Sequence, residues 1–177
     1  MDNNWLDLLQ NTNQLTKVVE TNKYTEQFGL TLSQQDAQLI LDNRKKTLSE
    51  QKRVEFGEGI TPKIIHEFCD SDYIDQSNYV ETIIRLQDIF YLYKNEMNDE
   101  ITDDELLHLM REQYEKLCFG DLDYLENTCH SDFAQAIRAG YEGYKYADGY
   151  GEYSKFDRQE RWSNELYEEA LMDLFGR

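Results

Sequence analysis

The stretch QSNYVETIIRLQDIFYLYKNEM, residues 76–97, decides the fold of this chain. Its apolar side chains recur at the spacing of one helix face, at Tyr79, Ile83, Leu86, Phe90, Tyr93 and Met97. Further apolar side chains widen this face to most of the circumference, namely Val80, Ile84, Ile89, Tyr91 and Leu92. A helix that is apolar nearly all round is buried among other elements. We therefore predict a helix over residues 76–97 at the centre of a helical domain.

Helices are also predicted before this central segment. Residues 15–28 form the first, which Gly29 closes in a left-handed conformation. A second starts at Ser33, with Asp36 in its first turn, and runs to about residue 53. A short third helix has Thr61 as its N-cap, because a proline follows at the first helical position. Residues 1–14 are either a short docking helix or a frayed arm.

The chain after the central segment contains clear helix starts and stops. Thr102 and Glu105 have the spacing of a capping box, and Gly120 ends the helix that follows. Asp121 caps another helix, which Gly140 closes. The two should pack antiparallel, because only one or two residues join them.

These elements predict an all-α protein, a single bundle-like domain of about six or seven helices. We place the helical core with a short N-terminal arm at residues 1–140. Residues 141–177 follow as a loop rich in tyrosine and glycine and a C-terminal amphipathic helix, which packs on the core or on a partner. Between the second and third helices, the run VEFGEG at residues 54–59 reads as a turn. Its two glycines precede a helix N-terminus, but Glu58 between them would repel an anion, so we favour a structural turn.

Acidic residues dominate the composition and limit the partners. The chain has 36 acidic and 18 basic residues, a net charge of −18, which disfavours direct binding to nucleic-acid phosphates. Residues 99–133 alone hold eleven acids against two bases. We expect either a solvated face or a surface for a protein partner that is itself basic. The candidate contact residues are Asp99, Glu100, Asp103, Asp104 and Glu105.

The tyrosine-rich loop supplies a second set of candidates. Tyrosine offers a large amphipathic contact area with few rotatable bonds, as in binding loops. The loop is thus either a contact surface or a lid over the bundle. Its candidate residues are Tyr141, Tyr144, Tyr146 and Tyr150.

The sequence contains no complete constellation for metal binding or catalysis. His66 and Cys69 are three residues apart on one helix, and His108 forms a lone Glu-x-x-His with Glu105. His130 directly follows Cys129, and no second pair completes a four-ligand zinc site. We expect no metal, no cofactor and no catalytic residue. A metal-binding bundle enzyme built on these histidines stays an alternative, and so does an acidic inhibitor that mimics nucleic acid.

Segments typical of export or membrane insertion are not evident. The N-terminus lacks a basic region followed by an apolar run, and the longest uncharged apolar run, residues 89–93, is too short to span a bilayer. The three cysteines form no Cys-x-x-Cys pair. We expect a cytoplasmic protein with reduced, packed thiols.

Five segments between about residues 32 and 137 resemble the family called domain of unknown function 6323. They are RVEFGEGI (53–60), HEFCDSDYI (66–74), NYVETI (78–83), IFYLYKNE (89–96) and TDDEL (102–106). The resemblance implies a bacterial cytoplasmic helical protein and brings no activity, cofactor or site. The negative charge, the helical hairpins and the tyrosine-rich loop, without a catalytic constellation, favour a non-enzymatic function exerted through contact with another protein.

Overall fold

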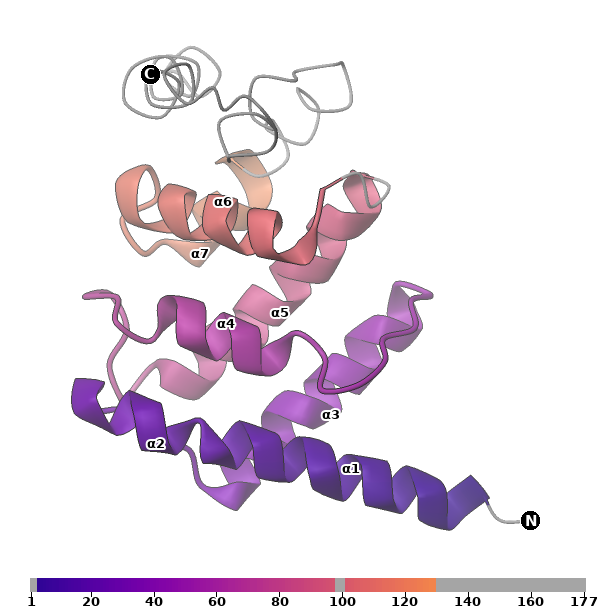
Figure 1. Ribbon diagram of the computed structural model, residues 1–177. Coiled ribbons are helices and arrows are strands. Elements are labelled where there is room, and N and C mark those ends of the chain that lie inside the picture. Colours follow the sequence, from indigo (N-terminus) through magenta and orange to yellow (C-terminus); the bar gives the residue numbers. More distant parts are fainter. Residues whose placement is uncertain (1–2, 98–100, 130–177) are drawn as a thin grey trace, which may run out of the picture. The chain divides into compact units, whose positions relative to one another are not determined.

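The computed structural model describes residues 3–97 and 101–129, and every regular element in these ranges is helical (Figure 1). In chain order these are α1 (Asn3–Glu20), α2 (Asn22–Thr25), η1 (Glu26–Phe28), α3 (Gln34–Glu50), α4 (Thr61–Phe68), α5 (Tyr79–Glu96), α6 (Asp103–Lys116), α7 (Leu122–Tyr124) and η2 (Leu125–Cys129). The predicted all-α class is confirmed. The chain divides into two compact units, residues 1–92 and 93–177, which are described in turn.

Helix α5 is the predicted central helix, and its burial confirms that prediction. Glu81 is the single residue of α5 that is exposed to solvent. The largest side chains of the helix are 0–1% exposed; they are Tyr79, Phe90, Tyr91 and Tyr93. The apolar pattern that runs round the helix therefore corresponds to packing on all of its sides.

Polar side chains of α5 join it to α3 inside the first unit. Asp88 accepts hydrogen bonds from the amide of Asn43 at 2.8 Å and from the hydroxyl of Thr47 at 2.6 Å. Gln87, which is fully buried, donates to the carbonyl of Ile40 at 3.1 Å. Buried polar groups are tolerated when they are paired, and here the pairing fixes the register of α5 against α3.

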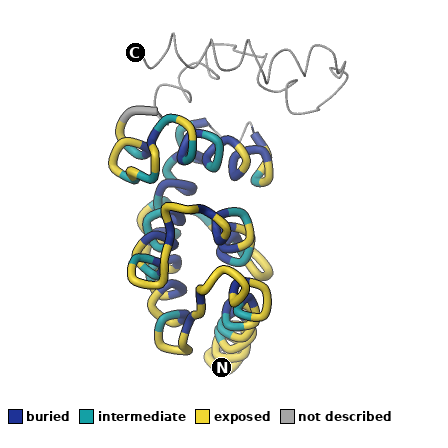
Figure 2. The backbone as a smooth tube through the Cα atoms, turned by 90° about the vertical axis from the view of Figure 1, so that its left-hand side faces the viewer, coloured by how far each residue is buried: buried dark blue, intermediate teal, exposed yellow. Residues whose placement is uncertain are grey.

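Helix α1 is longer than the sequence predicted. It begins at Asn3, so residues 1–14, which the sequence left open as a frayed arm or a docking helix, are helical from Asn3 onwards. The helix predicted over residues 15–28 is divided: its first part belongs to α1, and α2 and η1 form the rest. The hydroxyls of Thr12 and Thr16 each donate to the carbonyl four residues earlier, both at 2.9 Å, which satisfies these side chains within the helix. Much of this N-terminal half is exposed (Figure 2).

The predicted helix starts are confirmed at two positions and shifted at a third. Ser33 and Thr102 both form complete capping boxes. At α4, however, the N-cap is Ile60, and Thr61 is already helical. The Thr61 hydroxyl donates instead to the buried side-chain oxygen of Gln87, so it serves the core and not the cap.

The second unit contains the end of α5, then α6, α7 and η2. Lys94, which is 6% exposed, donates to the carbonyl of Ile101 at 2.8 Å and pairs with Asp103 at 2.9 Å. Asp121 caps α7 through the amides of Asp123 and Tyr124, as predicted. The predicted continuation of that helix to Gly140 lies beyond the described residues, as do the loop and the C-terminal helix. No helix in the described ranges is long and apolar enough to cross a membrane.

Candidate functional site

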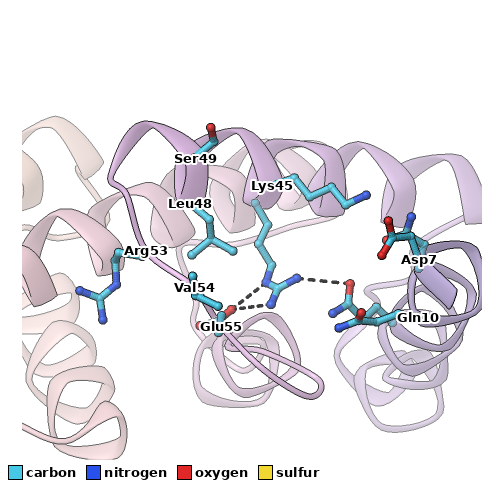
Figure 3. Close-up of a pocket in the computed structure, with 11 residues that line it drawn as sticks. Asp7, Gln10, Lys45, Leu48, Ser49, Arg53, Val54 and Glu55 are labelled. Carbon is cyan, nitrogen blue, oxygen red and sulfur yellow. Dashed lines mark hydrogen bonds and ion pairs between the residues drawn. The ribbon is translucent and has the colours of Figure 1, made fainter. Parts of the chain in front are cut away.

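An ion pair between a buried arginine and a half-buried glutamate connects α3 to the turn after it. Arg44 projects from α3 with its side chain only 3% exposed. Its Nε and Nη2 atoms both lie 2.7 Å from Glu55 Oε1 (Figure 3). Glu55 belongs to the run VEFGEG, which forms a turn without strand structure, as the sequence predicted. Because the two charges neutralise each other, each can be buried.

Two further side chains bind to this pair. Tyr91 of α5 donates its hydroxyl hydrogen to Glu55 Oε1 at 2.5 Å. Burial, together with the negative charge of Glu55, raises the pKa of Tyr91 well above the ordinary value for tyrosine. Gln14 of α1 accepts from Arg44 Nη1 at 3.3 Å and donates to the carbonyl of Gly57 at 3.1 Å. Three helices thus hold one turn.

Gly59 is required by the same arrangement. Its φ angle is +77°, in the region that favours glycine. A Cβ atom at this position would lie 2.5 Å from Nη2 of Arg44 and 2.7 Å from its Cζ. The guanidinium therefore packs directly against the backbone of the turn. This contact gives Gly59 a structural role in the turn.

This turn exposes two large apolar side chains beside the charged Glu58, which pairs with Lys17 at 3.5 Å. Residues 54–58, which we call the Phe56 turn, expose Phe56 by 84% and Val54 by 77%. Phe56 stands between Glu55, held by Arg44 and Tyr91, and Gly57, held by Gln14. A large aromatic side chain is therefore exposed on backbone that is anchored on both sides.

A cavity of about 440 Å³ lies beside the turn, between α1 and α3. Arg44 and Glu55 line it together with Asp7, Gln10, Asn11, Gln14, Lys45, Leu48, Ser49, Arg53 and Val54 (Figure 3). The lining contains no histidine or cysteine, and its most buried charges are committed to each other. It offers amide hydrogen bonds and a rim of mixed charge.

His66 and Cys69 differ in burial and contact each other through the backbone carbonyl of His66. His66 is exposed, and its ring packs against that of Tyr24 with 5.0 Å between centroids. Cys69 is buried, and its thiol donates to the carbonyl of His66 at 3.7 Å. Within residues 3–97 and 101–129 no group of three or more His, Cys, Asp or Glu could hold a metal ion.

The acidic candidates that the structure describes have different surroundings. Asp103 pairs with Lys94 and is partly exposed, Asp104 is exposed, and Glu105 is buried in the capping box of α6. His108 is exposed on the same helix. Six other candidates lie outside the described residues: Asp99, Glu100, Tyr141, Tyr144, Tyr146 and Tyr150. His130 also lies outside them.

Sequence reasoning missed the cluster around Arg44, although one signal pointed to it. Arg44 falls on the apolar face of the predicted second helix, in register with Ile40, Leu41 and Leu48. A cation at a core position needs a buried acceptor. Glu55 between Val54 and Phe56 was a candidate for that acceptor, because alternation turns it opposite to its apolar neighbours.

Comparison with known proteins assigns the chain to a family. The family of unknown function DUF6323 matches residues 17–143, and the chain belongs to it. The match extends beyond the five segments in which the resemblance was noted. It includes Arg44, Glu55 and Tyr91, but not Gln14. No curated protein and no solved structure is detectably similar to the chain.

Proposed function

We propose that this protein acts without catalysis, by docking a partner protein on the Phe56 turn. The observation that carries the proposal is the 84% exposure of Phe56 between two anchored neighbours. Aromatic side chains that fill a partner's pocket contribute much of the energy at protein interfaces. An anchored backbone loses little conformational entropy on binding, which raises affinity.

The buried ion pair supports this role. Removing Arg44 and Glu55 from water costs free energy that their attraction only partly offsets, so such a pair is a weak stabiliser. Its clearer effect is to fix one conformation of the turn. An ion pair that fixes the backbone on either side of an exposed phenylalanine is consistent with presentation of that side chain to a partner.

The partner we expect has an apolar pocket within a basic surface. The net charge of −18 attracts a basic protein over distances longer than the contact itself. In the described part of the acidic segment, Glu112 pairs with Lys116 at 3.1 Å and Glu115 with Arg111 at 3.2 Å. Each of these pairs is neutral overall, so the attracting field comes from the net charge of the chain, while the Phe56 turn supplies the anchor.

The proposal is tested by comparative capture from a lysate of the source organism, followed by reconstitution. Wild-type protein, Phe56→Ser and Leu39→Ser serve as baits at low salt. Leu39 is the matched control, because it is also an exposed apolar residue, at 57%, but lies on α3 away from the turn. A partner that both wild type and Leu39→Ser recover is then purified, and its affinity for each of the three baits is measured by titration.

We expect Phe56→Ser to weaken binding of the purified partner at least about tenfold and Leu39→Ser to leave it unchanged. Affinity should also fall as salt rises, because the steering field is screened. Binding that is equal for both variants, or that strengthens with salt, contradicts the proposal.

A further inference from the structure

Helix α1 carries a second apolar surface, separate from the Phe56 turn. Side chains at heptad spacing follow one line along the helix, namely Trp5, Leu8, Thr12, Leu15 and Val19. We call this line the α1 seam. Trp5 is 59% and Leu8 64% exposed, Thr12 is exposed, and the last two are half-buried. Leu9, 45% exposed, flanks it.

The N-terminal part of the seam, Trp5 to Thr12, is exposed, whereas Leu15 and Val19 are partly covered by their own unit. The opposite side of α1 lines the cavity through Asp7, Gln10 and Gln14, and further along it buries Val18 and Thr21. Residues four or seven apart share a face, whereas Gln14 and Thr12 differ by about 200° around the helix. Helix α1 therefore has one side that packs within the unit and one apolar side that is open.

From these observations we infer that the α1 seam pairs with the seam of a second copy of this chain. The distribution of charge on α1 decides which kind of molecule covers the seam. From Asn3 to Val19 the helix has two ionised side chains, Asp7 and Lys17, and neither belongs to the seam. A chain with net charge −18 repels its copy, so self-association requires a local surface free of charge. The seam meets that requirement.

The same feature argues against a membrane or a basic protein as the occupant. Helices that lie on membranes carry lysine and arginine on their polar face, whereas the first basic residue here is Lys17. A basic partner would need acidic residues beside the apolar strip, and the seam has none. Neutral Thr12 lies within the seam, and neutral Thr16 lies beside it.

An antiparallel arrangement fits the seam best. Opposed helix dipoles attract in that arrangement, whereas parallel dipoles repel. With the two-fold axis at Thr12, Trp5 meets Val19 of the second copy, and Leu8 lies opposite Thr16, one residue from Leu15. The same patch serves both copies, as two-fold symmetry requires. The exposed apolar area of the seam comes mainly from Trp5 and Leu8, which is small for a stable interface, so the dimer should be weak.

Sedimentation velocity of the full chain over a wide concentration range tests the inference. We expect reversible dimers that strengthen as salt rises, because salt screens the repulsion between copies. Trp5→Glu and Leu8→Glu should each abolish the dimer, and Thr12→Leu should tighten it about tenfold by removing a polar residue from the centre. Leu39→Glu is the control and should change nothing.

A crosslink gives an independent readout of the geometry. Thr12→Cys should form a disulfide-linked dimer on mild oxidation, because the two copies of residue 12 face each other, whereas Gln35→Cys on α3 should not. A monomer at every concentration overturns the inference, as does a dimer that survives both Glu substitutions. Neither result affects the Phe56 proposal, which concerns a different face.

Discussion

Tyr91 Oη lies 2.5 Å from Glu55 Oε1 and joins the central helix to the turn that exposes Phe56. The same carboxylate oxygen accepts from Arg44 Nε at 2.7 Å. One oxygen thus receives donors from α3 and α5. The position of the turn depends on this shared acceptor, and four predictions follow from its surroundings and from the neighbouring core.

The first prediction concerns the hydroxyl of Tyr91. Tyr91→Phe should lower the free energy of unfolding by about 1–3 kcal/mol, because it removes one hydrogen bond to a charged acceptor while keeping the ring. Urea unfolding followed by circular dichroism measures this change. Tyr24→Phe is the matched control, since Tyr24 is 44% exposed, and it should stay within about 0.5 kcal/mol of wild type. Equal effects of the two substitutions would refute the prediction.

The second prediction concerns coupling between Arg44 and Glu55. Arg44→Met leaves a largely buried carboxylate without its cation and should cost about 3 kcal/mol. Glu55→Gln leaves the guanidinium without its anion and should also destabilise. The double variant Arg44→Met with Glu55→Gln should cost less than the two single effects together, because it strands no charge. Additive losses in a double-mutant cycle would show that the pair is not coupled.

The third prediction separates the two reasons for glycine at position 59. Gly59→Ala forces alanine into a left-handed conformation and drives its Cβ into the Arg44 guanidinium. Gly29→Ala meets only the first penalty, because φ is +79° there but no atom lies within 4 Å of the added Cβ. We expect a loss of about 1 kcal/mol for Gly29→Ala and about 2–3 kcal/mol for Gly59→Ala. Equal losses in thermal unfolding would show that Arg44 moves aside freely.

Burial patterns explain which parts of the structure could be predicted. The apolar circumference of residues 76–97 and the capping pairs at Ser33 and Thr102 are local signals, and α5, α3 and α6 follow from them. The N-terminal half of α1 could not be predicted in this way, since its apolar residues face solvent and give no core-facing stripe. Residue spacing marked Arg44 as a buried cation, but its partners lie 11 residues away at Glu55 and 47 away at Tyr91. Only the three-dimensional structure brings them together.

The last prediction concerns alkaline pH. Burial raises the pKa of Tyr79 to about 12, and the charge of Cys69 acts in the same direction. The unfolded chain releases this proton near pH 10 and the folded chain near pH 12. Tyr79 therefore contributes its stabilisation fully below pH 10, and this is lost progressively as the pH rises to about 12.

The difference in the pKa of Tyr79 between the folded and the unfolded chain is worth about 2–3 kcal/mol of stability. Tyr91 should add to the loss of stability at high pH, because burial raises its pKa too. Urea unfolding at about pH 8.5 and pH 11.5 measures the loss. In Tyr79→Phe the decline between the two pH values should be smaller than in wild type, whatever the effect of the substitution at pH 8.5. Tyr24→Phe, which removes an exposed phenol, should keep the wild-type decline. An identical decline in all three proteins would show that Tyr79 ionises as readily in the folded chain as in the unfolded one.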